Sequence, residues 1–129
     1  MKPPFARAVE PVYTVFRIVV GGLFAFHGAQ KLFGVFGGPA QHLVSQMGLA
    51  GMIEFGCGVL VAIGFLTPFA AIIASGEMAV AYFTVHARLG RWPIQNHGEL
   101  AVLYCSAFLL IAARGSGMLS VDGILRRGR

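Results

Sequence analysis

The sequence predicts an all-α membrane protein, a single domain built as a four-transmembrane-helix bundle. Hydrophobic residues make up 57% of the 129 residues, charged residues only 12%, and the mean hydropathy is +0.75. Soluble globular proteins carry about 45–50% apolar residues, glycine included, and about 25% charged residues. The apolar runs are long and lack the alternation of membrane strands, so they favour helices. With so few charges to cover a surface in water, the chain is neither a disordered segment nor a soluble monomer.

The expected helices follow from the apolar runs and from the residues that interrupt them. Residues 11–33 form the first run, and the softer stretch 34–47, rich in glycine and polar residues, is typical of a loop. The next run, 48–86, is twice as long as the roughly 20 residues that one crossing needs. Gly64, Thr67 and Pro68 mark the fold-back, because proline suits the first turn of a helix. We therefore expect helices at about 46–66 and 68–87.

A fourth helix is expected at about 97–113. The polar loop before it, residues 88–96, carries Trp92, an interfacial residue type. Arg114 and the break Gly115-Ser116-Gly117 end this helix. The remaining residues form a short tail with a basic end, so residues 1–129 make one transmembrane domain.

The charges at the chain ends predict the orientation. The basic start followed by an apolar run is similar to a signal peptide, but Arg17 interrupts the run and no small-x-small cleavage site follows it. We therefore expect an uncleaved first helix. With four crossings, six Lys or Arg residues lie on the side of the termini and three on the other side. This distribution favours cytoplasmic N- and C-termini.

Net charge and cysteine content exclude two other classes of protein. The net charge is +5, yet the basic residues sit mostly at the termini and form no clustered patch for nucleic-acid phosphates. Cys57 and Cys105 lie inside apolar runs and form no CxxC pair. They indicate neither a disulfide framework nor a thiol-redox motif.

Three ionisable residues lie well away from the ends of the predicted spans: Arg17, Glu54 and Glu77. Each such charge near the membrane centre costs about 2.5–3.5 kcal/mol without a partner. At about 1.5 Å per residue, Glu54 and Glu77 lie roughly 12 Å from the outer ends of their helices and His27 roughly 8 Å. These three residues are therefore expected to meet in the outer half of the bundle. The group suits proton-coupled redox chemistry or the anchoring of an amphipathic ligand, and protonated glutamates acting as structural glue remain an equal alternative.

Other polar residues map to the same end of the bundle. His27, Gln30 and Lys31 share one helix face, and Lys31 is placed to snorkel to the interface. The facing loop region contributes Arg88, Arg91, Trp92, Asn96, His97 and Glu99. The histidines, His86 included, leave a bis-His haem or a His/Glu metal site open, but no HExxH or CxxCH motif supports one. We expect interfacial histidines, no haem and no metal.

Glycines recur on the first two predicted helices. They are Gly21, Gly22, Gly28, Gly51, Gly56, Gly58 and Gly64. Small residues let membrane helices approach closely, so this pattern predicts a tightly packed bundle rather than a pore.

Several motifs together resemble the DoxX family of small bacterial membrane proteins. In chain order they are Arg17, His27-Gly28-Ala29-Gln30-Lys31-Leu32-Phe33-Gly34, Glu54, Gly64-Phe65-Leu66-Thr67-Pro68, Glu77-Met78, Ala81-Tyr82-Phe83, His86, Gly90-Arg91-Trp92-Pro93, Asn96, Gly98-Glu99 and Ser120-Val121-Asp122. The likeness runs from about residue 13 to residue 122. It implies four transmembrane helices in the bacterial inner membrane. The family is named after a small subunit of a thiosulfate:quinone oxidoreductase, and some relatives are linked to membrane-associated responses to oxidative stress.

The residues and the resemblance together give three candidate functions. The first is a small subunit of a quinone-linked oxidoreductase or oxidative-stress complex, with a quinone as the candidate cofactor and a protein partner or a second copy beside it in the lipid bilayer. Its candidate ligand-binding residues are His27, Gln30, Lys31, Glu54, Glu77, Tyr82, His86, Asn96 and Glu99, with Arg17 in a structural role. The second is a non-catalytic scaffold that docks soluble partners. The third, transport of a proton or small substrate, is less favoured because the chain lacks the length of inverted repeats.

Overall fold

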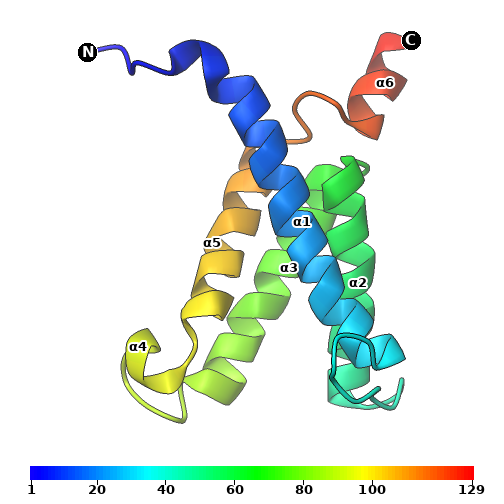
Figure 1. Cartoon of the computed structure of the whole chain (residues 1–129), viewed down its shortest axis with the longest axis vertical. Helices are drawn as coiled ribbons and strands as arrows, with labels where there is room; N and C mark the ends of the chain where they lie inside the picture. Colours follow the sequence, from blue (N-terminus) through cyan, green and yellow to red (C-terminus); the bar gives the residue numbers. More distant parts are fainter.

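The structure is a computed structural model that describes residues 1–129, and every regular element in it is helical (Figure 1). In chain order the elements are a 3₁₀ turn at Ala6–Ala8 (η1), α1 at Val9–Phe33, α2 at Gln46–Ile63, α3 at Thr67–Ala81, a π-helical turn at Tyr82–His86 (η2), α4 at Pro93–Asn96, α5 at Glu99–Arg114 and α6 at Val121–Arg127. Both chain termini lie at the same end of the bundle (Figure 1).

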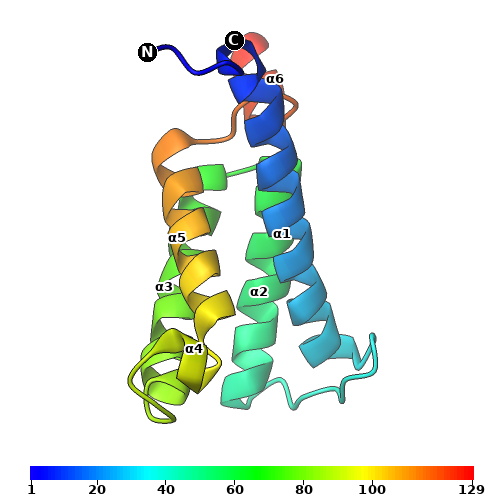
Figure 2. The ribbon, with the colours of Figure 1, turned by 60° about the vertical axis from the view of Figure 1, so that its left-hand side comes forward.

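The predicted all-helical membrane fold is confirmed. Three helical segments are long and apolar enough to cross a membrane by length and composition: Ala6–Phe33, Gln46–Ile63 and Thr67–His86. The fourth long helix, α5, has 16 residues, which is about 24 Å at 1.5 Å per residue. It is therefore shorter than the hydrocarbon core of a bilayer, about 30 Å thick. It packs along α3 and completes the bundle (Figure 2).

Residues with special backbone preferences set the helix ends. Ser45 caps α2, where its Oγ accepts a hydrogen bond from the Gly48 amide at 3.0 Å. Gly34 and Gly64 follow α1 and α2 with φ of 68° and 73°, a left-handed conformation that glycine adopts without strain. Pro68 stands in the first turn of α3, as the sequence predicts. These positions fix the two turns that reverse the chain.

The structure adds elements that the sequence pattern does not predict. The second helix ends at Ile63 rather than near residue 66, and the third changes from α- to π-helical geometry over Tyr82–His86. α4 forms inside the expected polar loop. The tail, expected as a short basic end, forms α6 because the Ser120 Oγ caps it by accepting a hydrogen bond from the Gly123 amide at 3.1 Å.

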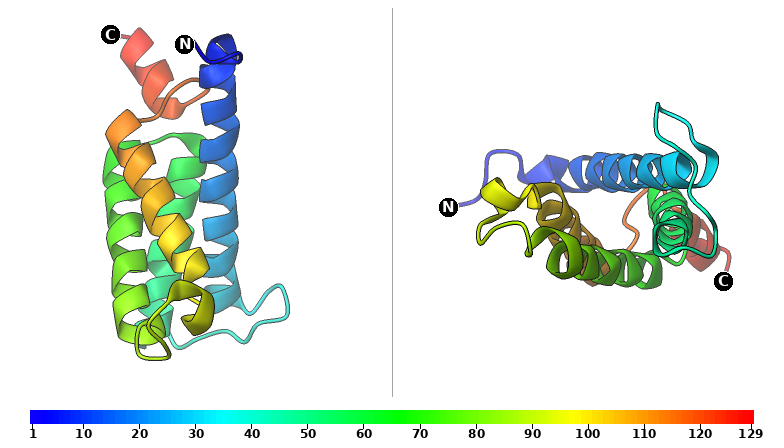
Figure 3. Two further views of the ribbon diagram at one scale, coloured as in Figure 1. Left: turned by 90° about the vertical axis from the view of Figure 1, so that its left-hand side faces the viewer. Right: turned by 90° about the horizontal axis from the view of Figure 1, so that it is seen from below.

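The four long helices pack as two pairs, α1 with α2 and α3 with α5. The backbones of the two pairs approach each other mainly at α2 and α3, while α1 and α5 meet through side chains, chiefly aromatic ones. Seen from below, the four helices surround a central region rather than forming one flat layer (Figure 3). The two pairs diverge toward the end opposite the termini (Figure 1).

Glycines explain the close approach of α1 and α2. A Cβ atom added at Gly28 would lie 2.2 Å from the backbone nitrogen of Phe55. Similar backbone contacts would meet a Cβ at Gly21 or Gly58, at 2.6 and 2.5 Å respectively. Only a residue without a side chain fits at these three positions, so the expectation of tight packing holds there.

Two glycines do not take part in this packing. A Cβ added at Gly22 or at Gly56 would meet no atom within 4 Å. The sequence groups them with the packing glycines because it does not show which helix face each one occupies.

Aromatic side chains fill the centre of the bundle. The ring of Phe24 on α1 lies 4.6 Å from that of Phe108 and 5.2 Å from that of Tyr104, both on α5. Val61 and Ile111 are fully buried beside them. Most large apolar side chains on the outer helix faces are exposed, as expected for surfaces that contact lipid tails. The bundle therefore has a small dry core and an apolar outer surface.

Arg17 ties the C-terminal tail to the bundle. Its side chain is fully buried, and its guanidinium donates hydrogen bonds to the carbonyl oxygens of Ser116, at 2.5 Å, and Leu119, at 2.9 Å. A buried charge of this kind is tolerated only where such acceptors surround it. We interpret Arg17 as the structural residue of this end of the molecule.

Asp122 on α6 makes a second connection, to the start of α3. Its carboxylate accepts hydrogen bonds from the backbone amides of Leu66 and Thr67 and from the Thr67 hydroxyl, at 3.0 to 3.1 Å. Partial burial alone would raise the pKa of Asp122, but these hydrogen bonds and the nearby Arg126 outweigh it and lower the pKa. Asp122 therefore acts as the N-terminal cap that α3 lacks within its own sequence.

Candidate functional site

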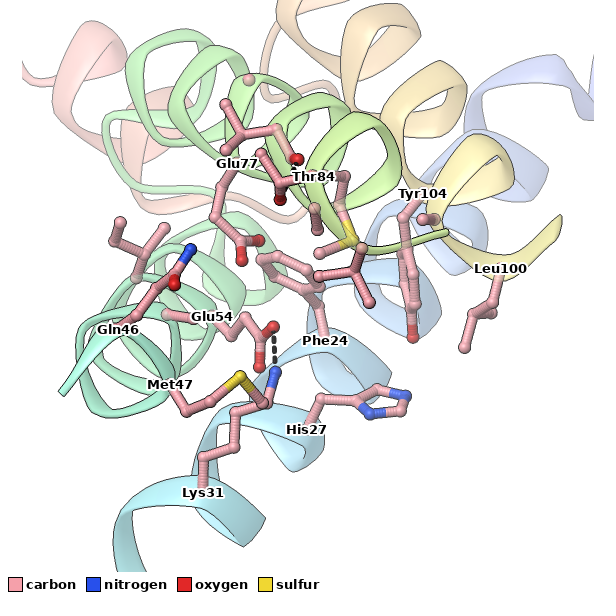
Figure 4. A pocket seen from close by; sticks show the side chains of 18 of the residues that line it. Phe24, His27, Lys31, Gln46, Met47, Glu54, Glu77, Thr84, Leu100 and Tyr104 are labelled. Atoms are coloured by element: carbon pink, nitrogen blue, oxygen red, sulfur yellow. Dashed lines mark hydrogen bonds and ion pairs between the residues drawn. The ribbon is translucent and has the colours of Figure 1, made fainter. Parts of the chain in front are cut away.

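A cavity of about 570 Å³ lies between the helix pairs at the end opposite the chain termini (Figure 4). All four long helices contribute to its wall, and most of the lining side chains are hydrophobic. Its size is within the range of small-molecule sites, about 300–1,000 Å³. Several lining residues of α2 and α3, such as Met47, Leu49, Ile73 and Val80, are also exposed on the outer surface. The cavity therefore opens toward the lipid as well as toward the bundle interior.

An ion pair stands at one side of this cavity. The Lys31 Nζ atom, in the last turn of α1, lies 2.5 Å from Oε1 of Glu54 on α2. The Glu54 side chain is only 2% exposed and that of Lys31 is 21% exposed. Gly51 makes room for the pair, because a Cβ there would come within 2.9 Å of the Lys31 Cβ. The same close packing of α1 and α2 thus places an ammonium group next to a buried carboxylate.

Glu77 on α3 faces this ion pair across the cavity (Figure 4). One oxygen of Glu77 and one of Glu54 are buried and have no hydrogen-bond partner. The Glu77 carboxyl is close enough to both Glu54 and Lys31 to interact with their charges. With one ammonium for two carboxyl groups, the cluster is neutral only when one carboxyl carries a proton. The cluster therefore requires one proton for neutrality and leaves two buried carboxyl oxygens without a hydrogen-bond partner.

His27 and Tyr104 complete the polar part of the wall. The two rings meet edge to face, with centroids 6.0 Å apart and planes at 89°. Both line the cavity together with Phe24 (Figure 4). His86 lines its far side, and its Nδ1 lies 3.1 Å from the carbonyl oxygen of Asn96. The structure thus brings together five of the sequence-predicted ligand residues: His27, Lys31, Glu54, Glu77 and His86.

Tyr104 is a cavity residue that the sequence interpretation leaves out. His97, Leu100, Ala101 and Tyr104 all line the cavity, and they are spaced at i, i+3, i+4 and i+7. This is the spacing of one helix face. Extending the face that begins at His97 along the fourth helix would have identified the tyrosine.

Asn96 and Tyr82 lie outside the cavity lining and organise the connection between α3 and α5. The fully buried Asn96 amide donates to the Tyr82 hydroxyl at 3.2 Å and to the Gly90 carbonyl at 3.1 Å. Its side-chain oxygen accepts from the Gly98 amide at 2.8 Å. These bonds hold a turn in which His97 has a left-handed backbone. Asn96 therefore supports the cavity from behind and does not face it.

Gln30 and Glu99 also lie outside the cavity lining. The Gln30 amide donates to the carbonyl oxygen of Phe36 at 3.2 Å and so contacts the loop between α1 and α2. Glu99 is exposed in the first turn of α5, where a negative charge favours the helix N-terminus. Both residues share an end of the molecule with the cavity without contributing to its wall.

The structure does not assemble a metal centre from these residues. No group of three or more His, Cys, Asp or Glu side chains is placed to hold a metal ion. The cluster around Lys31 instead combines hydrogen-bond donors and acceptors with a large apolar surface. Such a site suits an organic ligand with a polar head and an apolar body.

Comparison with known proteins places the chain in a family. The sequence model of the DoxX family matches residues 12–87. An uncharacterized protein of Haemophilus influenzae is 38% identical over 121 residues, covering 88% of this chain and 90% of the relative. The inner membrane protein YqjF of Escherichia coli is 28% identical over 120 residues, covering 88% and 91%. No solved structure matches the chain. The protein is therefore a membrane protein that belongs to the DoxX family.

Proposed function

We propose that this protein is a quinone-binding subunit of a bacterial inner-membrane oxidoreductase or oxidative-stress complex. The observation that carries the proposal is the pair of buried, unpartnered carboxyl oxygens beside Lys31 in a cavity that is otherwise apolar. Buried polar atoms without partners are rare in folded proteins, and a ligand is the simplest partner for them. We assign that ligand to the quinone class because it must dissolve in the membrane and still form hydrogen bonds.

The cavity wall matches the two parts of a quinone. A quinone ring carries carbonyl oxygens that accept hydrogen bonds, and the Lys31 ammonium, the Tyr104 hydroxyl and a protonated carboxyl of the Glu54 and Glu77 pair can each donate one. Phe24 and Ile53 offer apolar surface to the ring. The exposed lining residues of α2 and α3 leave a route by which an apolar tail reaches the lipid.

A bound quinone would supply electron and proton transfer, while the protein's own residues hold a proton, position the polar groups and exclude water. The Glu54 and Glu77 pair holds the proton that the cluster needs for neutrality, so a proton can be delivered or taken up at the cavity wall. Lys31 fixes Glu54 in place through the ion pair. The apolar lining excludes water from the rest of the surface. A chain of 129 residues has little room for further redox apparatus, so we assign the electron source to a protein partner or a second copy.

The relatives support an inner-membrane location, and the charges support an orientation. One relative is named as an inner membrane protein, which supports the same membrane for this chain. Six Lys or Arg residues, four from the last 16 residues of the chain, lie beyond the membrane-spanning region at the end that carries the termini. Three lie at the opposite end. We propose that the termini are cytoplasmic and that the cavity lies in the outer half of the membrane.

Two exposed glycines give a matched test of quinone binding. Gly76 on α3 lines the cavity and Gly56 on α2 does not, yet a Cβ at either position would meet no atom within 4 Å. Phenylalanine at position 76 should fill the cavity without disturbing helix packing. The protein purified in mild detergent is extracted with organic solvent, and quinone per mole of protein is measured. We expect bound quinone with the wild type and with Gly56→Phe. With Gly76→Phe the quinone bound per mole of protein should fall about ten-fold, which corresponds to about 1.4 kcal/mol of binding free energy.

A wild-type extract without quinone would refute the proposal. Equal quinone content in Gly76→Phe and Gly56→Phe would refute the cavity as the binding site, because the quinone would then be held on the outer surface of the protein together with lipid and detergent.

A non-catalytic scaffold is the second candidate, and the Lys31–Glu54 pair favours it. This ion pair joins α1 to α2, so it can hold the bundle together without any ligand. The scaffold predicts that Glu54→Gln lowers the melting temperature in detergent while quinone content and co-purifying proteins stay the same. The quinone-binding function predicts instead that Glu54→Gln lowers the quinone content as well.

A further inference from the structure

A second cavity, also of about 570 Å³, lies at the end of the molecule that carries the termini. Its wall comes from the start of α3, the end of α5 and the C-terminal helix α6. Three arginines line it: Arg114, Arg126 and Arg129. The cavity is thus formed by segments far apart in the sequence that the tail connections of Arg17 and Asp122 bring together.

Two of these arginines are held in place by contacts within the chain. The Arg126 guanidinium donates to the Ser116 hydroxyl at 2.9 Å and to the Asp122 carbonyl at 3.3 Å. Arg114 pairs with Glu10 and lies over the Tyr13 ring, 4.4 Å from its centroid. Arginine side chains fixed in this way lose less conformational entropy when they bind an anion.

The charge of the cavity is strongly positive. Its one lining carboxylate, Asp122, already accepts three hydrogen bonds at the start of α3. Across the whole end of the molecule outside the spans, six basic side chains face two acidic ones, Glu10 and Asp122. Counted in the same way, the opposite end carries three basic side chains and one acidic one, Glu99. The larger part of the positive charge outside the spans therefore surrounds this cavity.

Apolar side chains border the arginines on the membrane side. Phe69, in the first turn of α3, is 70% exposed, and Leu66 and Leu125 are 48% and 55% exposed. These residues lie where the membrane-spanning helix α3 begins. A ligand that fills this site must present a negative group to the arginines and apolar chains to Phe69 at once.

We propose that this cavity is a binding site for the headgroup of an anionic phospholipid, with its phosphate on the arginines and its acyl chains along Phe69. Arginine forms paired, charge-assisted hydrogen bonds with phosphate. A free phosphate ion would satisfy the charge but leave the apolar border without a partner. A zwitterionic lipid would place its acyl chains against the apolar border, but its headgroup would also bring a positive charge into a positively charged cavity.

Purified, delipidated full-length protein in dodecyl maltoside provides the test. Binding is measured by native mass spectrometry with dioctanoyl phosphatidylglycerol, dioctanoyl phosphatidylcholine and inorganic phosphate as separate probes. We expect saturable binding of phosphatidylglycerol alone. Arg126→Gln should weaken it about ten-fold, equivalent to about 1.4 kcal/mol, because the phosphate loses a charge-assisted hydrogen bond.

Matched variants separate the site from general charge attraction. Arg127 neighbours Arg126 but does not line the cavity, so Arg127→Gln should keep wild-type affinity. The double variant Arg88→Gln and Arg91→Gln removes two charges at the opposite end and should also bind normally. Arg129→Gln is a second test, since Arg129 lines the cavity and makes no hydrogen bond or ion pair that holds the fold.

The proposal is overturned if Arg127→Gln weakens binding as much as Arg126→Gln, because attraction would then be diffuse. It is also overturned if phosphatidylcholine binds equally well or if inorganic phosphate occupies the site in place of the lipid. Retained affinity in both Arg126→Gln and Arg129→Gln would place the lipid elsewhere. None of these outcomes depends on quinone binding in the other cavity.

Discussion

Replacing Gly28 with alanine tests the physical basis of the fold. The new Cβ would lie 2.2 Å from the Phe55 nitrogen, 2.6 Å from the Phe55 Cα and 2.7 Å from the Gly51 carbonyl oxygen. Favourable contacts between such atoms lie near 3.5–4.0 Å. The neighbours are backbone atoms and cannot rotate away, so α1 and α2 must separate locally by about 1 Å. Overpacking of this kind costs about 1–3 kcal/mol.

Gly22 is a nearby control on the same helix. A Cβ at Gly22 meets no atom within 4 Å, so Gly22→Ala removes only the conformational freedom of glycine. This should stabilise the helix by about 0.5–1 kcal/mol. The same gain applies to Gly28→Ala, so the two alanine variants should differ by the overpacking cost alone, about 1–3 kcal/mol. At about 4 °C per kcal/mol for a domain of this size, their melting temperatures should differ by at least about 4 °C.

Thermal unfolding in detergent, followed by circular dichroism, measures this difference. Gly58→Ala and Gly56→Ala repeat the comparison on α2, with a Cβ 2.5 Å from the Ala25 nitrogen in the first case and no neighbour in the second. Equal melting temperatures for Gly28→Ala and Gly22→Ala would show that α1 and α2 do not approach as closely as described. A stabilised Gly28→Ala protein would refute the reasoning altogether.

Three further predictions concern the end that carries the termini. Asp122→Asn should destabilise the start of α3 by about 1 kcal/mol through loss of its cap, seen as faster amide hydrogen exchange at Thr67, while Glu99→Gln on α5 should leave that exchange unchanged. Folding lowers the pKa of Asp122, so its carboxylate stabilises the fold fully at any pH above the pKa of the unfolded state, about 3.9. This stabilisation is lost as the pH falls through the lower pKa of the folded state. The protection factor of the Thr67 amide, which corrects for the pH dependence of intrinsic exchange, should therefore fall below about pH 4 in the wild type, and a matching change in Asp122→Asn would contradict this assignment. Arg17→Leu leaves the buried carbonyl oxygen of Ser116 without its donor, at about 1–3 kcal/mol, removes the hydrogen bond to Leu119 as well, and should speed exchange throughout α6; unchanged exchange there would mean that the tail is held by other contacts.

The sequence predicts the helical framework well because the length of each apolar run and the residues that begin and end each helix are local properties of the chain. The turn at Gly64 and Pro68 is visible from residue types alone, and the structure places the chain reversal there. Equal depth along antiparallel helices also predicts that Glu54 and Glu77 approach each other with His27. All three line the same cavity, with Glu77 across it from Glu54.

The remaining features depend on side-chain contacts that the sequence pattern does not show. The ion pair between Lys31 and Glu54 requires the rotation of α1 against α2, which the glycines set and the sequence pattern does not show. The sequence pattern groups Asn96 with the candidate ligand residues. In the structure it is buried in a turn instead, because its side chain hydrogen-bonds to Tyr82 and Gly90 in the preceding segments. α6 owes its position to Arg17 and Asp122, whose partners lie about 50 to 100 residues away in the sequence.

The divergence of the two helix pairs has a mechanical consequence. The pairs are joined near the chain ends by the Arg17 and Asp122 connections and at mid-bundle by Phe24 against Phe108, and beyond these contacts they separate toward the other membrane face. Phe108, Arg17 and Asp122 do not line the first cavity. A substitution that altered their packing would therefore change the width of that cavity while leaving every residue of its wall in place.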